Sequence, residues 1–286
     1  MIFESFKRVL NRKKYVLLYL FCMTFAGALC IGGALLYILQ DFQSYRESEH
    51  EYEEVEENFV EFEGDSEVFN TEAVEEYSSV ESNFTTEVPK EYEKFPKMNV
   101  NHTALRDINP DYVGWLYIPV LEISYPVVKG IDNDYYLTHT FQNSVNDSGA
   151  IFVDAYAEYY DFDYIFYGHS MKDGSMFQKL KKFDRDASLC KTDPYMYFYT
   201  DGWCYKFEIY SYYVTTVDSP TYMLIPDNMA YKTFVDYNVE KSNYKPDHDL
   251  NYNNKSITLS TCYGTTGEER YVVNAIYEDV YSVDYN

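Results

Sequence analysis

Near its C-terminal end the chain reads Ser256-Ile-Thr-Leu-Ser-Thr-Cys262, then Tyr263-Gly264 and, eight residues after the cysteine, Arg270-Tyr-Val-Val273. Both runs are rich in residues that favour β-strands, and the stretch between them contains glycine, which favours a loop. We therefore predict two antiparallel strands joined by a loop over residues 263–269. Such a pair would bring Arg270 alongside Cys262.

Six further β-rich runs precede this pair. They are separated by turn residues such as Pro119 and Gly130. The dipeptide Asp201-Gly202, between two aromatic runs, predicts a two-residue hairpin loop. The eight predicted strands are Trp115–Ile118, Ile123–Val128, Ala150–Val153, Tyr164–Tyr167, Tyr195–Thr200, Tyr205–Val214, Ser256–Ser260 and Tyr271–Tyr277.

Helical patterns are few. Leu105–Asn109 resembles a short helix ended by Pro110, Ser175–Phe183 places apolar residues on one helical face, and Asp227–Lys241 follows Pro226. Eight short strands with so few helices predict a mainly β fold, either a closed barrel or a sandwich.

Composition limits the possible functions. The 286 residues include 47 acidic and 23 basic side chains, for a formal net charge of −24. Phosphate contacts need Lys and Arg, so this charge argues against nucleic-acid binding. An apolar fraction of 46% is enough for a core and excludes wholesale disorder. The five cysteines contain no CxxC pair, which argues against a zinc module or a disulfide scaffold.

The first 39 residues have the pattern of a membrane anchor. Residues 1–14 hold five basic residues and one acid, and residues 15–39 carry no charge. At about 1.5 Å per residue, a helix of this length spans a bilayer core of about 30 Å. The alternative is a signal peptide cleaved near Ala26-Gly27-Ala28, but the apolar run continues too far beyond it. The positive-inside rule then predicts a cytoplasmic segment 1–14, a single span 15–39 and an extracellular remainder.

Residues 40–95 are strongly acidic. They contain 19 acidic and three basic residues, for a net charge of −16. Because like charges repel and few apolar residues are present, we predict a flexible, extended stalk. Tyr45, Tyr52, Val55, Phe59 and Phe62 fall near heptad spacing, so a coiled coil or a docking helix is the alternative. Residues 96–286 then form the globular domain.

Three residues of that domain suggest nucleophilic catalysis. Cys262 stands at the end of a predicted strand and opens into a loop, where a thiol is well placed to attack. His169 also follows a strand, Tyr164–Tyr167, and an imidazole can activate a thiol. Arg270 could stabilise an oxyanion, or it could pair with Glu268 or Glu269.

The other candidates have simpler interpretations. Cys190 and Cys204 lie in or beside aromatic runs and are predicted to be buried thiols, with a disulfide between them as the alternative. His102, His139 and His248 lie in polar contexts typical of ordinary surface or hydrogen-bonded histidines.

The motifs taken together resemble the sortases, cysteine transpeptidases of Gram-positive cell surfaces. Thr-Leu-Ser-Thr-Cys262 resembles their TLxTC signature, and Arg270 stands where their arginine follows. Tyr-Gly-His169-Ser-Met-Lys-Asp-Gly-Ser-Met-Phe is similar to the class B histidine motif. Val113-Gly-Trp-Leu-Tyr-Ile-Pro119, Tyr125-Pro-Val-Val and Asp132-Asn-Asp-Tyr-Tyr-Leu137 also resemble class B. The similarity covers residues 109–277, with its motifs in the family's order.

The resemblance implies a fold and a chemistry. The fold is an eight-stranded sortase barrel with N-terminal helices and, in class B, a helix between strands 6 and 7, which Asp227–Lys241 would supply. Cys262 would form a thioester with the threonine of a C-terminal sorting motif. Arg270 would hold the oxyanion, and His169 would protonate the leaving amine and deprotonate the incoming one. This chemistry needs no metal and no cofactor.

The resemblance also implies partners. Class B substrates carry an NPxTx-like motif on a surface protein, and the accepting amine belongs to a peptidoglycan precursor. Residues that resemble the lining of the family's substrate groove are Asn133, Leu137, Tyr167, Tyr222 and Ser260, with barrel packing as the alternative for each. Ser170 departs from the asparagine that often follows the histidine, and Tyr263 departs from the residue expected after the cysteine, which puts substrate preference in question.

Other classes fit less well. A papain-like hydrolase usually has its cysteine before its histidine, and an L,D-transpeptidase has His-Gly before its cysteine. A non-catalytic, membrane-anchored surface-binding domain would not need Cys262, His169 and Arg270 together. Within the sortases, a pilin polymerase that uses a lysine of another protein as acceptor is the alternative.

Overall fold

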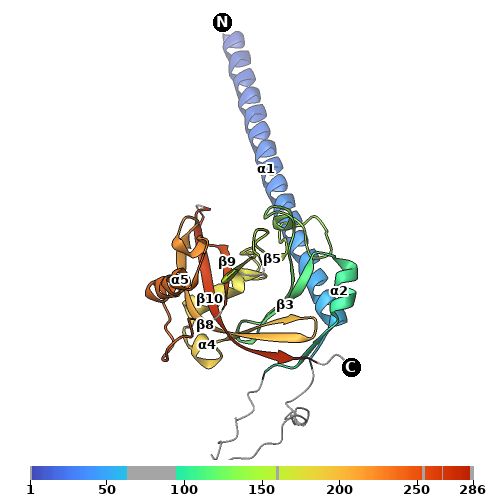
Figure 1. Ribbon diagram of the computed structural model, residues 1–286. Coiled ribbons are helices and arrows are strands. Elements are labelled where there is room, and N and C mark those ends of the chain that lie inside the picture. The colour runs from blue at the N-terminus through green and yellow to red at the C-terminus, as the bar shows by residue number, and fades with distance from the viewer. Residues whose placement is uncertain (1, 63–94, 159–160, 253–254, 266, 284–286) are drawn as a thin grey trace, which may run out of the picture. The chain divides into compact units, whose positions relative to one another are not determined.

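The computed structural model describes residues 2–62, 95–158, 161–252, 255–265 and 267–283 (Figure 1). The chain divides into two compact units, residues 1–50 and 51–286. The helices are α1 (Ile2–Phe59), α2 (His102–Ile108), α3 (Lys182–Arg185), α4 (Ser188–Thr192) and α5 (Asn228–Lys241). Short 3-10 helices are η1 (Pro119–Leu121), η2 (Tyr135–Leu137), η3 (Phe177–Lys181) and η4 (Pro220–Tyr222).

Eight strands close into a barrel in the order β10-β8-β7-β3-β4-β5-β6-β9. These strands are β3 (Tyr112–Ile118), β4 (Ile123–Val128), β5 (Ile151–Val153), β6 (Asp163–Tyr167), β7 (Tyr195–Thr200), β8 (Trp203–Thr216), β9 (Ser256–Cys262) and β10 (Glu269–Ser282). The pairs β4–β5 and β6–β9 are parallel and the other pairs are antiparallel. Closure leaves no open edge on the barrel sheet, whose strands all lie within the described residues. The mainly β fold and the eight-stranded barrel predicted from sequence are confirmed.

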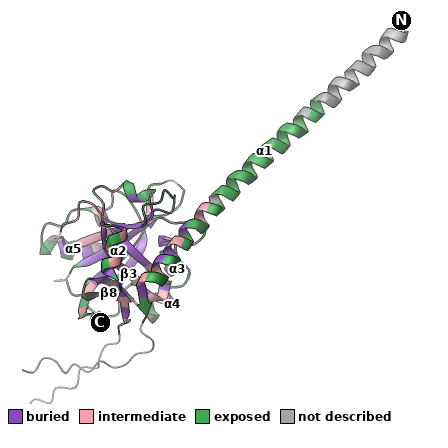
Figure 2. Cartoon of the chain, turned by 90° about the vertical axis from the view of Figure 1, so that its right-hand side faces the viewer, coloured by how far each residue is buried: buried purple, intermediate pink, exposed green. Residues whose placement is uncertain are grey.

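The core lies inside this barrel. Trp115 on β3, Tyr199 on β7 and Tyr271 on β10 are fully buried, and Figure 2 shows buried residues concentrated in the barrel. The Trp115 indole N–H donates to the Ser124 hydroxyl at 2.9 Å, so the ring is buried with its polar atom satisfied. The Asp201-Gly202 hairpin is present, and Gly202 has a positive φ of 77°, which glycine adopts without steric cost.

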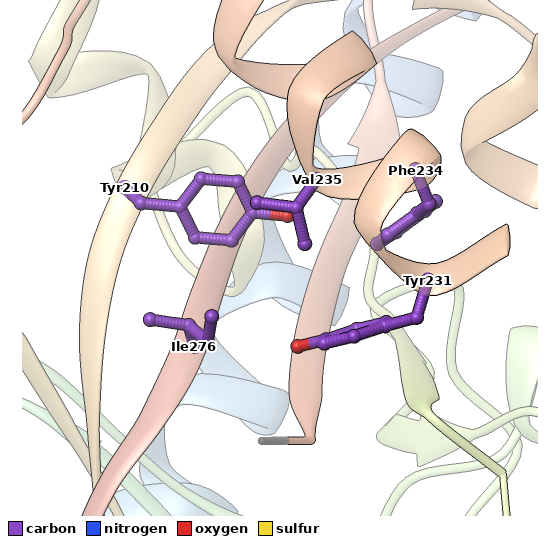
Figure 3. Close-up of a cluster of buried hydrophobic side chains, with 5 residues drawn as sticks. All are labelled: Tyr210, Tyr231, Phe234, Val235 and Ile276. Atoms are coloured by element: carbon purple, nitrogen blue, oxygen red, sulfur yellow. The ribbon is translucent and has the colours of Figure 1, made fainter. Parts of the chain in front are cut away.

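The predicted helix between strands 6 and 7 of the barrel is α5, which lies between β8 and β9 in the chain. Asp227 caps it by accepting from the Ala230 N–H at 2.8 Å. Its residues Tyr231, Phe234 and Val235 recur at helical spacing and point toward Tyr210 of β8 and Ile276 of β10 (Figure 3). This apolar stripe fixes the helix on the barrel.

The structure differs from the predicted stalk over residues 40–62. Residues up to Phe59 are helical, and β1 (Val60–Phe62) pairs antiparallel with β2 (Met98–Val100). Tyr52 and Val55 are buried in the second unit, while Glu53, Glu54 and Glu57 are exposed. A helix can thus turn its glutamates to water and its apolar residues to the barrel, which removes the reason for an extended chain. Residues 63–94, the rest of the predicted stalk, lie outside the described residues.

The apolar segment of α1 differs from the rest of this helix in its hydrophobicity. The described part of this helix contains one stretch long and apolar enough to cross a membrane. Its large apolar side chains are exposed, as the green ribbon of Figure 2 shows. The exposed ones include Leu20, Phe21, Phe25, Leu29, Ile31, Leu35 and Ile38.

The predicted helix over Ser175–Phe183 begins later than the sequence pattern suggests. Met176 has a positive φ of 52° and pairs with Ser170 in an isolated β-bridge, so the first turn cannot be helical. The segment then continues as η3 and α3.

Candidate active site

A groove with a volume of about 330 Å³ opens at one end of the barrel. All eight residues predicted from sequence to form the site contribute to its walls. Its lining residues are Asn133, Leu137, Phe152, Tyr167, Gly168, His169, Val217, Tyr222, Ser260, Thr261, Cys262 and Arg270. Segments that are distant in the chain, from residue 133 to residue 270, therefore converge on one cavity.

Cys262 and Arg270 face each other across the β9–β10 pair. Cys262 is the last residue of β9, and the antiparallel register places it directly opposite Arg270. Opposed residues of an antiparallel pair project their side chains from the same face of the sheet. The predicted juxtaposition of these two residues is confirmed. The Cys262 residue is exposed, so its thiol is accessible to a ligand in the groove.

His169 reaches the same groove by the parallel pairing of β6 with β9. In that register Tyr167 is the partner of Ser260, and the Gly168 N–H donates to the Ser260 carbonyl at 3.2 Å. A Cβ at Gly168 would lie 2.4 Å from Ile151 Cδ1 and 2.9 Å from Phe177 Cγ, so any larger residue would force these neighbours to shift. This close packing holds the backbone just before His169.

The imidazole of His169 is oriented by a backbone carbonyl. Its Nε2 lies 2.8 Å from the carbonyl oxygen of Leu137. A carbonyl oxygen only accepts hydrogen bonds, so Nε2 carries the hydrogen in this contact. The other ring nitrogen, Nδ1, is then the atom that can take up and release a proton.

The guanidinium of Arg270 is anchored through one of its nitrogens. Nη1 donates to the carbonyls of Gly267 at 2.7 Å and Glu269 at 3.0 Å. Both contacts are to main-chain oxygens, so they hold the guanidinium without using a carboxylate. Guanidinium donors that these carbonyls do not use can serve a ligand in the groove.

The groove floor is held by hydroxyl and carboxylate contacts. The hydroxyls of Tyr222 and Ser260 are 2.8 Å apart. Burial raises the pKa of the Tyr222 phenol, so this group stays neutral and can donate a hydrogen bond. Asp154 accepts from the Tyr167 hydroxyl at 3.0 Å and from the Asn133 amide at 3.3 Å. These contacts hold the side chains of Asn133, Tyr167, Tyr222 and Ser260 in place along the groove.

Several groove residues were not predicted from sequence. Phe152, Val217 and Thr261 also line the groove. Asp154 accepts hydrogen bonds from two of the lining side chains, those of Asn133 and Tyr167. Thr261 precedes the cysteine within the strand motif, and this position was the one available signal for it. Nothing in their spacing marks Phe152 or Val217, because segments far apart in the chain supply them.

Lys181 of η3 also lies beside this region. Its ammonium donates to the Ser170 hydroxyl at 2.6 Å and lies 5.3 Å from the centroid of the Tyr263 ring. It therefore contacts the residues that follow His169 and Cys262 in the chain. Burial lowers its pKa, and the nearby Cys262 sulfur opposes that shift.

The remaining domain cysteines are unlike Cys262. Cys190 and Cys204 are free and buried, so the predicted buried-thiol interpretation is confirmed. Burial raises the pKa of each to about 12, which keeps both protonated at neutral pH. Among the described residues, no group of three His, Cys, Asp or Glu side chains could hold a metal ion.

The closed eight-stranded barrel and the groove lined by Cys262, His169 and Arg270 together define a class of protein. Comparison with known proteins identifies that class. The Sortase domain family model matches residues 116–278, so the chain belongs to the sortase family. Sortase B of Listeria monocytogenes is 36% identical over 163 residues, which are 55% of this chain and 65% of that protein. The match thus covers less than two thirds of the length of that protein.

Solved structures point to class B within the family. The X-ray structure of Clostridium perfringens sortase B is 34% identical, with a TM-score of 0.58, and the match covers 62% of this chain and 99% of that one. Sortase B of Bacillus anthracis in complex with AAEK1 is 28% identical, with a TM-score of 0.62 and coverage of 82% and 98%. The class B resemblance predicted from sequence is thereby confirmed.

Proposed function

We propose that this protein is a membrane-anchored sortase that transfers surface proteins to an amine. It would cleave an NPxTx-like C-terminal sorting motif and join the new carboxyl end to a peptidoglycan precursor. The observation that carries the proposal is the convergence of Cys262, His169 and Arg270 on one groove. A thiol, an imidazole and a guanidinium are the nucleophile, proton carrier and oxyanion donor that acyl transfer requires.

The first half of the reaction makes a thioester. The Cys262 sulfur, as a thiolate, attacks the carbonyl carbon of the sorting-motif threonine, and the oxygen gains negative charge. Arg270, opposite Cys262 in the sheet, donates to that oxygen. His169 gives a proton to the leaving amine as the carbon–nitrogen bond breaks. With Nε2 held by the Leu137 carbonyl, Nδ1 is the nitrogen that makes this transfer.

The second half regenerates the enzyme. An acceptor amine attacks the thioester carbon and loses a proton to the imidazole of His169, which the first half left neutral. A second oxyanion forms beside Arg270 and collapses, the carbon–sulfur bond breaks, and a new amide forms. Cys262 leaves as a thiolate and His169 is again protonated, so both residues return to their starting states.

The groove would hold the sorting motif along residues from four segments. Asn133 and Leu137 come from the loop and 3-10 helix before β5, Tyr167 and Ser260 come from the paired strands β6 and β9, and Tyr222 ends η4. Hydroxyl and amide groups at these positions suit a peptide whose main chain and polar side chains need hydrogen-bond partners.

The apolar segment of α1 would anchor the enzyme. One stretch of this helix is long and apolar enough to span a bilayer, and a basic segment precedes it. We propose that residues 1–14 lie in the cytoplasm, residues 15–39 span the membrane and residues 96–286 form an extracellular catalytic domain. This arrangement would put the groove on the side where surface proteins emerge.

The proposal is tested with the full-length chain in detergent, a fluorogenic NPxTx-like peptide and an amine acceptor. Cys262→Ala should form no acyl-enzyme by intact mass and release no product, because it lacks the nucleophile. Cys204→Ala is the matched control, since it also removes one thiol but from a buried site. A folded Cys262→Ala variant that still cleaves the peptide would contradict the proposal. Product without acceptor incorporation would indicate a hydrolase instead.

A further inference from the structure

Tyr52 of α1 is linked to both of the segments that position His169, directly to one and through Tyr125 to the other. It belongs to residues 51–59, the part of the helix within the barrel unit, and it is 7% exposed. One segment is the loop over residues 137–149, whose Leu137 carbonyl binds the imidazole. The other is the turn over residues 169–177, which carries the histidine itself.

The hydroxyl of Tyr52 makes two hydrogen bonds to the 137–149 loop. It donates to the Gly149 carbonyl at 2.6 Å and accepts from the Phe141 N–H at 3.2 Å. Phe141 and Gly149 are both buried, so removing the hydroxyl takes a hydrogen-bond partner from two buried backbone groups. One phenol thus pairs two main-chain groups that are eight residues apart.

A short series of backbone hydrogen bonds connects Gly149 with Leu137. The Gly149 N–H donates to the Asn146 carbonyl at 3.1 Å, and the Asn146 N–H donates to the Thr138 carbonyl at 3.0 Å. Thr138 adjoins Leu137, whose carbonyl accepts from His169 Nε2. The position of Gly149 therefore influences the position of the carbonyl that orients the imidazole.

The ring of Tyr52 is linked to the 169–177 turn through Tyr125 of β4. It packs edge-to-face on Tyr125 of β4, with ring centroids 5.3 Å apart. The Tyr125 hydroxyl accepts from the Met176 N–H at 3.1 Å, and the neighbouring Phe177 N–H donates to the His169 carbonyl at 2.9 Å. Two separate series of contacts thus connect Tyr52 with His169, one through the 137–149 loop and one through Tyr125.

We propose that Tyr52 is a positioning residue for catalysis, which fixes the imidazole of His169 through the 137–149 loop and the 169–177 turn. This role rests on the proposed function only in that His169 is the proton carrier. Tyr52 is not among the groove-lining residues, so it acts on the imidazole and not on the substrate. The N-terminal helix would thereby be part of the catalytic machinery's support and not only a connection to the membrane.

The test compares two phenylalanine variants of the full-length chain in detergent. Tyr52→Phe keeps the ring and removes the hydroxyl. Tyr199→Phe is the matched control, because it also removes a buried hydroxyl that donates to a backbone carbonyl, that of Pro96, at a position outside the groove lining. Small misplacements of a reacting group cost large factors in rate, so we expect Tyr52→Phe to lower kcat about tenfold or more with KM changed less than about twofold.

A second measurement needs no turnover. The chain has five histidines, so selective nitrogen-15 labelling gives few ring signals, and His169→Gln assigns the one of interest. At a pH high enough for the ring to be neutral, the His169 signals of the unchanged protein should show hydrogen on Nε2 and none on Nδ1. In Tyr52→Phe they should shift toward a mixture of ring forms, while Tyr199→Phe should leave them in place.

The outcomes separate the two proposals. A lower kcat and shifted His169 signals in Tyr52→Phe alone support the positioning role. The role is wrong if Tyr52→Phe changes neither, or if Tyr199→Phe changes them equally. If the unchanged protein does not process the peptide, the proposed function fails and the ring signals alone decide the positioning role. If Tyr52→Phe does not fold, Tyr125→Phe removes the hydroxyl that holds Met176 and is judged by the same criteria.

Discussion

Val55→Ala tests whether residues 51–59 pack on the barrel. Val55 is 1% exposed and lies one helical turn after Tyr52. Truncation removes about two methylene equivalents at about 0.8 kcal/mol each, and an unfilled cavity raises the cost to about 2 kcal/mol. Alanine is the better helix former by about 0.5 kcal/mol, which offsets part of this loss. The net cost is therefore about 1.5 kcal/mol.

The assay is thermal unfolding of the full-length chain, followed by tryptophan fluorescence, to which the fully buried Trp115 contributes. For a unit of this size, about 1.5 kcal/mol corresponds to a fall in Tm of about 3–6 °C. Glu53→Ala is the matched control, since it makes alanine on the same helix from an exposed residue, and it should leave Tm within about 1 °C.

The sign of the change distinguishes the two interpretations of this segment. In a free acidic stalk, Val55→Ala removes no buried contact and can only favour the helix, so Tm would stay constant or rise slightly. A Tm for Val55→Ala equal to that of Glu53→Ala would therefore refute the packing argument for the segment.

Two further outcomes are expected. Arg270→Lys keeps the positive charge but loses the planar set of donors, so kcat for the sorting peptide should fall by about two to three decades; a variant within threefold of the unchanged protein would remove Arg270 from the oxyanion role. Burial raises the pKa of Asp163 to about 6, above its unfolded value of 3.8, while the Ser256 hydroxyl donates to it at 2.7 Å. The folded chain then binds more protons than the unfolded chain, so this stabilising contribution is present below about pH 4 and is lost as pH rises through about 6. Asp163→Asn should remove that dependence, so its Tm relative to the unchanged protein should increase from pH 4 to pH 7, and parallel Tm curves would contradict the assignment.

Local patterns in the sequence were sufficient for much of the fold. Strand runs, the Asp201-Gly202 turn and the helix after Pro226 are encoded by residues close together in the chain. The facing of Cys262 and Arg270 was predictable for the same reason, since a short loop between two strands fixes which residues oppose each other. The apolar stretch of residues 15–39 was likewise recognisable from its length and lack of charge.

Other features depend on contacts between distant segments, which no local pattern specifies. The parallel pairing of β6 with β9 brings His169 to the groove, and the Leu137 carbonyl that orients its ring comes from 32 residues earlier. The start of η3 after Met176 is set by a β-bridge to Ser170, which overrides a helical periodicity.

The acidic segment, residues 40–95, shows most clearly what local sequence patterns could not predict. Its charge predicts an extended chain only if every side chain is exposed to water. Composition does not say which side chains are exposed and which are buried. Tyr52 and Val55 share one side of α1, and only the barrel supplies the apolar surface and the backbone groups at Gly149 and Phe141 that this side can bind. Sequence alone determined the eight barrel strands and the placing of Cys262 opposite Arg270. Tertiary contacts decided how the histidine is oriented, because hydrogen-bond partners far apart in the chain meet only in the folded barrel.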